Sequence, residues 1–111
     1  MINVTIKQGE ITASGHAGYA PKGQDIVCAA FSVLSLTLEI AVERLTKDDI
    51  RISLENGEMA AQWKQVSPEG LLLIKAYIEG VKALADNYPE YITVQARDTL
   101  KTEEKSRRGT R

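Results

Sequence analysis

The chain contains one cysteine, Cys28, and one histidine, His16, and these two residue types together can perform nucleophilic catalysis. A free thiol is mostly protonated at neutral pH, so a cysteine nucleophile needs a base or surroundings that favour the thiolate. Imidazole is the side chain best suited to serve as that base near pH 7. If the thiol has an imidazole base within the chain, the base must be His16. The pair therefore predicts acyl-transfer chemistry of the cysteine protease kind, with Cys28 as nucleophile and His16 as base.

Cys28 stands at the start of a predicted helix. Asp25 supplies an N-cap type of side chain, and the residues after it keep helical spacing as far as about Leu45. Cys28 is then the third helical residue, where unpaired backbone N–H groups and the helix dipole favour a negative sulfur. We expect the same N–H groups to serve as an oxyanion hole.

His16 lies in a glycine-rich segment, GHAGYAPKG, that spans residues 15–23. Such a sequence can neither continue a strand nor begin a helix, so we expect a mobile loop that brings His16 beside the helix start. Glycines near the histidine would let a substrate backbone approach closely. We predict that residues 17–24 close over a peptide, and the candidate substrate-loop residues are Ala17, Gly18, Tyr19 and Gly23.

Three residues have competing assignments. Asp25 is predicted either to cap the helix or to orient the imidazole as the third member of a triad. Ser32 lies one turn after Cys28 and either hydrogen-bonds the site or bonds back to the carbonyl four residues earlier. Cys28, which Ala29, Ala30 and Phe31 follow, also fits a buried packing residue with an inert thiol.

The rest of the pattern predicts an α+β domain of two β-hairpins, each followed by a helix, and a final strand. Apolar residues alternate over 2–6 and 10–14, and again over 50–54 and 59–63, with turns at 8–9 and 56–57. A second helix begins after Ser67-Pro68 and ends near residues 87–89, and a last strand covers 91–96. We expect a mainly antiparallel sheet with the helices packed on it.

Length and charge fit one domain over residues 1–97 and a charged tail over 98–111. The 111 residues are 43% hydrophobic and 26% charged, which is ordinary for a globular protein. A net charge of −1 gives the chain no electrostatic attraction for nucleic acid or for an anionic membrane. The tail has five Lys or Arg against three acidic residues, which is typical of a solvated terminus.

The same sequence predicts a cytoplasmic protein without metal or other cofactor. A single cysteine excludes an internal disulfide framework, and the N-terminal residues lack the features of a signal peptide. The longest charge-free apolar run, residues 26–38, has 13 residues, whereas a membrane span needs roughly 20. One cysteine and one histidine do not complete a zinc site. No phosphate-binding glycine motif stands before a helix.

The residues around the pair form a distinctive string. It consists of Gly15-His16-Ala17, Tyr19-Ala20, Gly23 and Asp25-Ile26-Val27-Cys28-Ala29-Ala30, with Ser32 and Leu34. This string resembles the bacterial ribosomal-processing cysteine protease family, called Prp. The resemblance implies a homodimeric endopeptidase that removes the N-terminal extension from the precursor of a large-subunit ribosomal protein. It also implies that His16 and Cys28 are the essential pair, and it matches Gly15, Asp25 and Ser32 to recurrent family positions.

Two other functions stay open from the residues alone. In a non-enzymatic ribosome-associated binding module, the loop and the tail would contact a partner and Cys28 would only pack. In a thiol redox sensor, the sulfur would be exposed and reactive, but the chain holds no second cysteine to resolve the oxidised form. Reaction of the thiol with peptide electrophiles, lost in His16→Ala, separates the protease from the binding module.

Overall fold

Alternating apolar residues build the strands of a single sheet. The computed structural model describes residues 1–55 and 57–96. The first hairpin consists of β1 (Ile2–Lys7) and β2 (Glu10–Ser14), the second of β3 (Arg51–Glu55) and β4 (Glu58–Gln62), and the last strand is β5 (Ile92–Ala96). Both predicted hairpins and the final strand are confirmed to within about a residue. The expected tail over 98–111 and the first residue of the expected turn at 56–57 lie outside the described residues.

The sheet is mixed rather than wholly antiparallel. Its strand order is β3-β4-β2-β1-β5, and every neighbouring pair is antiparallel except β1 and β5, which are parallel. A parallel pair needs a long crossover connection, so β5 reaches the edge beside β1 only because α2 (Pro68–Asn87) carries the chain back. The predicted α+β class with a mainly antiparallel sheet is confirmed.

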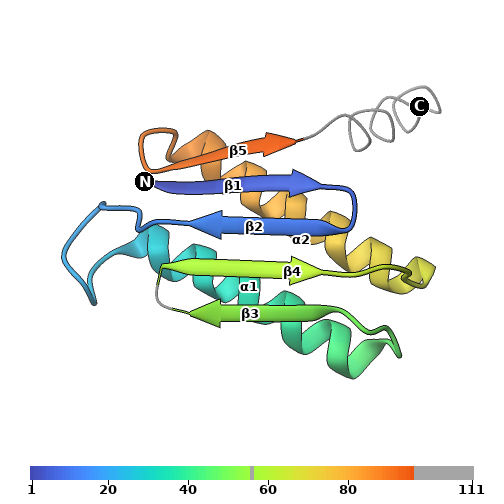
Figure 1. Cartoon of the computed structure of the whole chain (residues 1–111). Coiled ribbons are helices and arrows are strands. Elements are labelled where there is room, and N and C mark those ends of the chain that lie inside the picture. Colours follow the sequence, from blue (N-terminus) through green and yellow to red (C-terminus); the bar gives the residue numbers. More distant parts are fainter. Residues whose placement is uncertain (56, 97–111) are drawn as a thin grey trace.

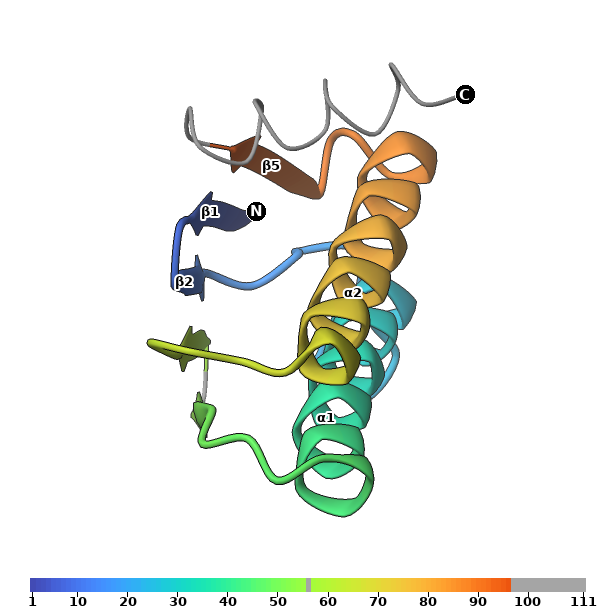
Figure 2. The same ribbon diagram turned by 90° about the vertical axis from the view of Figure 1, so that its right-hand side faces the viewer.

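Both helices cover the same face of the sheet. Figure 2 shows the sheet as one layer, with α1 (Ile26–Leu45) and α2 side by side as the second layer. Each helix begins at the predicted cap: Asp25 caps α1, and Ser67 caps α2 with Pro68 as the first helical residue. The core lies between the layers, where alternate strand residues meet one stripe of each helix. Its largest fully buried apolar side chains are Ile6, Ile11, Ile92, Val4, Val27 and Val81.

Helix α1 is only partly buried. Its buried residues are Val27, Phe31, Ser35, Leu38 and Val42, but several apolar side chains on its other faces are exposed. By length and average hydropathy the 20-residue helix meets the requirement for a membrane span, a test that the core helices of soluble proteins also pass. Only 22% of its most apolar window is buried within the chain. Much of the apolar surface of α1 therefore has no partner within the described residues.

The topology brings three segments to one end of the molecule. Figure 1 shows the loop after β2, the start of α1 and the turn between β3 and β4 at the same edge of the fold. Strand β2 pairs directly with β4, so the point where β2 ends lies beside the point where β4 begins. His16 follows the first of these points and Cys28 follows the start of α1, so the sheet order itself positions the predicted pair.

A buried hydrogen bond joins the two helices. The hydroxyl groups of Ser35 in α1 and Tyr77 in α2 are 2.8 Å apart, and the Ser35 hydroxyl also donates to the carbonyl of Phe31 at 3.0 Å. Ser35 is the one buried polar side chain in the described core. Burial raises the pKa of Tyr77 to about 12, and the hydrogen bond to Ser35 opposes that rise. The phenol is therefore held protonated inside the helix interface.

This shift predicts a loss of stability at high pH. The pKa of Tyr77 is near 10 in the unfolded chain and about 12 in the folded chain. The contribution of the protonated phenol to stability is therefore complete below pH 10, and it is lost as the pH rises to about 12. We expect the difference in unfolding free energy between wild type and Tyr77→Phe to narrow above about pH 10. Urea unfolding of both proteins at several pH values measures this. A constant difference across that range would contradict the assignment.

Candidate active site

The backbone before His16 is fixed at the turn between β3 and β4. The N–H of Gly15 donates to the carbonyl oxygen of Gly57 at 2.8 Å, which extends the pairing of β2 with β4 past the end of β2. Gly15 has a φ of +98°, and a Cβ at this position would collide with the carbonyl oxygen of Met1. Only glycine fits here, so the chain can turn sharply out of β2 and deliver His16 to the end of the sheet.

The residue after His16 is fixed at the sulfur. The N–H of Ala17 donates to Sγ of Cys28 at 3.3 Å, and Ala17 is buried with 3% of its surface exposed. Cys28 itself is half-buried and packs against the core, so its sulfur is neither sealed inside nor fully solvated. An N–H donor stabilises a thiolate more than a thiol. This contact brings the histidine segment and the predicted nucleophile together.

His16 and Cys28 line the same cavity. The cavity has a volume of about 930 Å³ and lies between the loop, the start of α1 and the second hairpin. It brings together most of the predicted site residues: Gly15, His16, Gly18, Gly23, Asp25, Cys28 and Ser32. Ala17 and Tyr19 do not line it. The imidazole is exposed to solvent, and within residues 1–55 and 57–96 it forms no hydrogen bond with the sulfur. The structure thus places the pair at one cavity with room for a peptide.

Residues of the second hairpin complete this cavity, and no local pattern predicted their place beside it. Three places in the hairpin contribute to its walls: the end of β3, the turn and the start of β4. The residues are Leu54, Glu55, Gly57, Glu58 and Met59. In the sequence, positions 56 and 57 indicated only a tight turn. Their place beside the site follows from the pairing of β2 with β4, which is a long-range contact without a local signal.

Asp25 caps the helix. One carboxylate oxygen accepts the N–H groups of Val27 at 3.0 Å and Cys28 at 2.9 Å, and the other accepts the N–H of Tyr19 at 3.0 Å. Burial disfavours ionisation of this carboxyl, but its backbone donors outweigh burial and hold its pKa below the ordinary value. Both oxygens are engaged by backbone, so of the two predicted roles the structure favours the cap over the orientation of His16.

The expected oxyanion hole at the start of α1 is wrong for the backbone N–H groups of Val27 and Cys28. Both groups donate to the Asp25 carboxylate. The next N–H, that of Ala29, donates to the carbonyl oxygen of Asp25. The Asp25 carboxylate that caps the helix therefore binds the N–H groups that we expected to bind the substrate carbonyl oxygen.

The loop is anchored at two points rather than one. Beyond the contact of Ala17 with the sulfur, the Asp25 carboxylate holds the backbone of Tyr19, and the Tyr19 ring meets Tyr88 and Tyr91 edge-on at centroid distances of 5.8 and 5.1 Å. Between these anchors and α1, residues 21–24 are exposed. Gly18 and Gly23 adopt positive φ values of 72° and 90° and face open space. The exposed part of the loop therefore lies between the Tyr19 anchor and the start of α1.

Ser32 is the remaining predicted site residue. Ser32 is exposed and lines the cavity, and in the described part of the chain its hydroxyl makes no hydrogen bond. A supporting role for it stays a prediction.

Across the described residues, no group of three or more His, Cys, Asp or Glu side chains is arranged to hold a metal ion.

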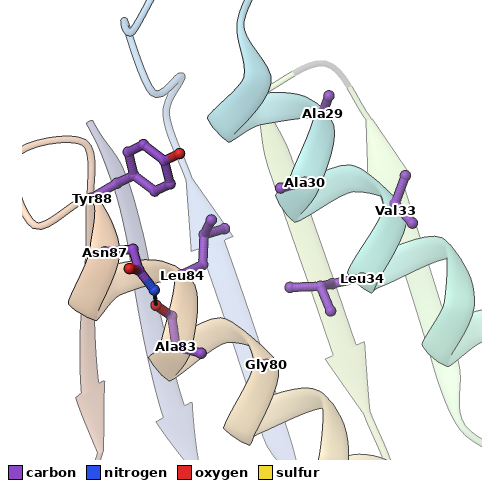
Figure 3. Close-up of a pocket in the computed structure, with 9 residues that line it drawn as sticks. All are labelled: Ala29, Ala30, Val33, Leu34, Gly80, Ala83, Leu84, Asn87 and Tyr88. Atoms are coloured by element: carbon purple, nitrogen blue, oxygen red, sulfur yellow. Dashed lines mark hydrogen bonds between the residues drawn. The ribbon is translucent and has the colours of Figure 1, made fainter.

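A second hollow lies between the helices, away from this site. Figure 3 shows a groove of about 870 Å³ between α1 and α2, with Val33 and Leu34 on one side and Leu84 and Tyr88 on the other. Gly80 allows the close approach, because a Cβ there would lie 2.9 Å from Leu34 Cδ2. The groove is lined mainly by aliphatic side chains and contains no nucleophile–base pair. The predicted nucleophile and base both line the first cavity instead.

Comparison with known proteins shows the family of this chain. Residues 1–93 match the family model described as Cysteine protease Prp. The chain is 33% identical over 97 residues to the Ribosomal processing cysteine protease Prp of Mycoplasma pneumoniae, covering 86% of this chain and 94% of that protein. It is 31% identical over 96 residues to the protein of the same name from Mycoplasma genitalium, covering 85% and 94%.

Solved structures share the fold. An essential ribosomal processing protease Prp from S. aureus, determined with a covalently linked product peptide, has a TM-score of 0.83 at 23% identity and covers 87% of this chain and all of that one. A protein from Streptococcus mutans has a TM-score of 0.68 at 28% identity, covering 86% of this chain and 90% of that chain. The mixed sheet with two helices on one face is thus a fold that these proteins have in common.

The double role of Asp25 generates a prediction. Asp25→Ala removes the cap of α1 and the anchor of Tyr19, so we expect a loss of about 1–2 kcal/mol in unfolding free energy and faster trypsin cleavage after Lys22. Because the pKa of Asp25 is lowered, its contribution is present above its ordinary value of 3.8 and is lost as pH falls through the lowered value.

Ser67→Ala, which removes the cap of α2, is the matched control for this variant. It should lower the unfolding free energy without changing the rate of cleavage after Lys22, since Ser67 has no contact with the loop. Equal cleavage rates in wild type and Asp25→Ala would show that the carboxylate does not anchor the loop.

Proposed function

This chain belongs to the family of the cysteine protease Prp, and we propose that it removes the N-terminal extension of a large-subunit ribosomal protein precursor during ribosome assembly. The single observation that carries the assignment of residues is the contact between Ala17 N–H and Cys28 Sγ, which places the histidine segment at the sulfur. In this proposal Cys28 is the nucleophile and His16 is the general base. Gly15, Asp25 and Ser32 support the pair.

In the first half of the reaction, His16 takes the thiol proton as Cys28 Sγ attacks the carbonyl carbon of the scissile bond. The tetrahedral adduct collapses when the C–N bond breaks, and the imidazolium gives its proton to the leaving amine. This leaves the N-terminal part of the substrate as a thioester on Cys28. The imidazole lacks a hydrogen bond to the sulfur in the described structure, and such catalytic hydrogen bonds commonly tighten only when the substrate binds.

In the second half, His16 removes a proton from water, and the resulting hydroxide attacks the thioester carbonyl. The C–S bond breaks, the product leaves as a carboxylic acid, and the imidazolium returns its proton to the sulfur. Each step uses only Cys28, His16, the peptide and water. The mechanism therefore needs no metal and no other cofactor.

The proposed substrate is an extended peptide. The cavity runs past the end of the sheet, the loop and the start of α1, so a bound segment would meet backbone on several sides. Gly18 and Gly23 would let the loop close over it, which would limit cleavage of wrong peptides by induced fit. The names of the Mycoplasma relatives supply the ribosomal substrate class. Because bacterial ribosomes are assembled in the cytoplasm, a cytoplasmic location is part of this proposal.

The binding-module and redox-sensor hypotheses have less support than the protease. A non-enzymatic module would need Cys28 only as packing, yet the sulfur accepts a backbone N–H and borders a cavity. A redox sensor has no use for a peptide-sized cavity. Family membership also favours the protease over both alternatives.

We also propose that the protein works as a homodimer. Val33, Leu36 and Ile40 follow one another at helical spacing on α1 and are 61%, 45% and 45% exposed. An apolar stripe of this kind is typical of a surface that a second protein covers. A second copy would cover the stripe symmetrically, which is the commonest form of association.

Cleavage of synthetic peptides tests the protease proposal. Peptides spanning the N-terminal regions of ribosomal protein precursors are incubated with wild type, Cys28→Ala and His16→Ala, and the products are read by mass spectrometry. We expect a single cut by wild type, none by Cys28→Ala, and a rate lowered by about 10²–10⁴-fold in His16→Ala. Cleavage by Cys28→Ala would contradict the assignment of the nucleophile.

Sedimentation velocity tests the dimer. Leu36→Glu places a charge in the exposed stripe of α1, so we expect a monomer where wild type sediments as a dimer. Leu72→Glu is the matched control, because Leu72 is an equally apolar residue on α2 and is 68% exposed. A monomeric wild type, or a dimer that survives Leu36→Glu, would contradict the proposed interface.

A further inference from the structure

We propose that Gly57, in the turn between β3 and β4, is a positioning residue for His16. Because Gly57 has no side chain, the imidazole of His16 packs against it, and we call this packing surface the seat. The Gly57 carbonyl oxygen holds the backbone of Gly15, the residue before His16. The inference rests on the proposed function, because it takes His16 as the base. It assigns to the second hairpin a part in the reaction that the sequence did not suggest.

The first observation is the packing of the imidazole on Gly57. A Cβ added at Gly57 would lie 2.9 Å from Nε2, 3.3 Å from Cε1 and 3.6 Å from Cδ2 of His16. These atoms are Nε2 and the two carbons bonded to it, so the Nε2 end of the imidazole packs against the glycine. A carbon at 2.9 Å is well inside the ordinary contact distance of about 3.5–4.0 Å, so any side chain at this position would displace the imidazole.

The second observation is independent of the ring. The carbonyl oxygen of Gly57 accepts the N–H of Gly15 at 2.8 Å, one residue before His16. On the other side of the histidine, the N–H of Ala17 donates to Cys28 Sγ. His16 is therefore held between two backbone contacts, one to the turn and one to the nucleophile, while Gly57 supports its side chain.

The seat matters because the rest of the imidazole has little support. The side chain of His16 is exposed, and it forms no hydrogen bond within the described residues, so the contacts of its neighbours hold its backbone but not its ring. A catalytic base displaced by about 1 Å can lose roughly 10²-fold in rate. The turn limits where the exposed ring can go, and a rigid hairpin of the sheet is better suited to this than a glycine-rich loop.

The glycine is also required by the backbone, so a control must separate the two effects. Gly57 has a φ of +77°, a conformation that is strained for any residue with a side chain. Gly9, in the turn between β1 and β2, has a φ of +78°, and a Cβ there would lie 2.9 Å from the Trp63 carbonyl oxygen. Gly9→Ala therefore brings similar strain and a similar contact distance, but at the end of β2 opposite to His16.

The test is the rate of alkylation of the single thiol by iodoacetamide as a function of pH, for wild type, His16→Ala, Gly57→Ala, Gly9→Ala and the double variant of His16 and Gly57. We expect Gly57→Ala to move the pH profile at least halfway to that of His16→Ala, and Gly9→Ala to leave it at the wild-type position. In the His16→Ala background, Gly57→Ala should change nothing further, because its effect passes through the imidazole.

Two outcomes would overturn the inference, and they are distinguishable. If His16→Ala differs from wild type while Gly57→Ala does not, His16 acts on the thiol but Gly57 does not position it. If His16→Ala matches wild type, the pairing of His16 with Cys28 fails, and the proposed mechanism fails with it. A change in Gly57→Ala that persists in full in the double variant would also refute a role through His16.

A measurement on the unaltered protein covers the case in which Gly57→Ala does not fold. The chain has one histidine, so its imidazole protons are assigned without ambiguity in a proton NMR spectrum. We expect nuclear Overhauser contacts between the outer imidazole protons and the α protons of Gly57. Their absence in the folded wild type would overturn the seat.

Discussion

The hydrogen bond from Ala17 N–H to Cys28 Sγ is the contact on which the site depends. It joins the first residue after His16 to the third residue of α1, two parts of the chain that the fold brings together from separate elements. The loop, the turn of the second hairpin and the cap of the helix are each arranged so that this contact can form.

The start of α1 has to satisfy two demands at once. Its free N–H groups and dipole favour an anion, and both the Asp25 carboxylate and a thiolate at Cys28 compete for them. The structure gives the N–H groups of Val27 and Cys28 to Asp25, and the sulfur takes its donor from Ala17 instead. The carboxylate in turn fixes Tyr19, so the residue that starts the helix also holds the loop that carries the base. Helix capping and loop anchoring are therefore a single feature.

Local signals were enough to predict every element and to select residues that line one cavity. The alternation of apolar and polar residues predicted the hairpins, and the capping residues Asp25 and Ser67-Pro68 predicted where the helices begin. The one cysteine and the one histidine of the sequence predicted the pair. The parallel pairing of β5 with β1 and the place of Gly57 beside His16 could not be predicted, because both depend on which strands become neighbours in the sheet. The oxyanion hole failed for a different reason: the sequence does not tell whether a cap residue leaves the first N–H groups free.

The most direct test of this account is the amide resonance of Ala17 in a ¹⁵N-labelled sample titrated with base. If its N–H is bound to the sulfur, its chemical shift should change as the Cys28 thiol ionises, at the same pH at which alkylation of the thiol accelerates. The change should persist in His16→Ala and disappear in Cys28→Ala. An Ala17 amide that shows no titration in wild type, or the same titration in Cys28→Ala, would contradict the claim that this contact joins the loop of the base to the nucleophile.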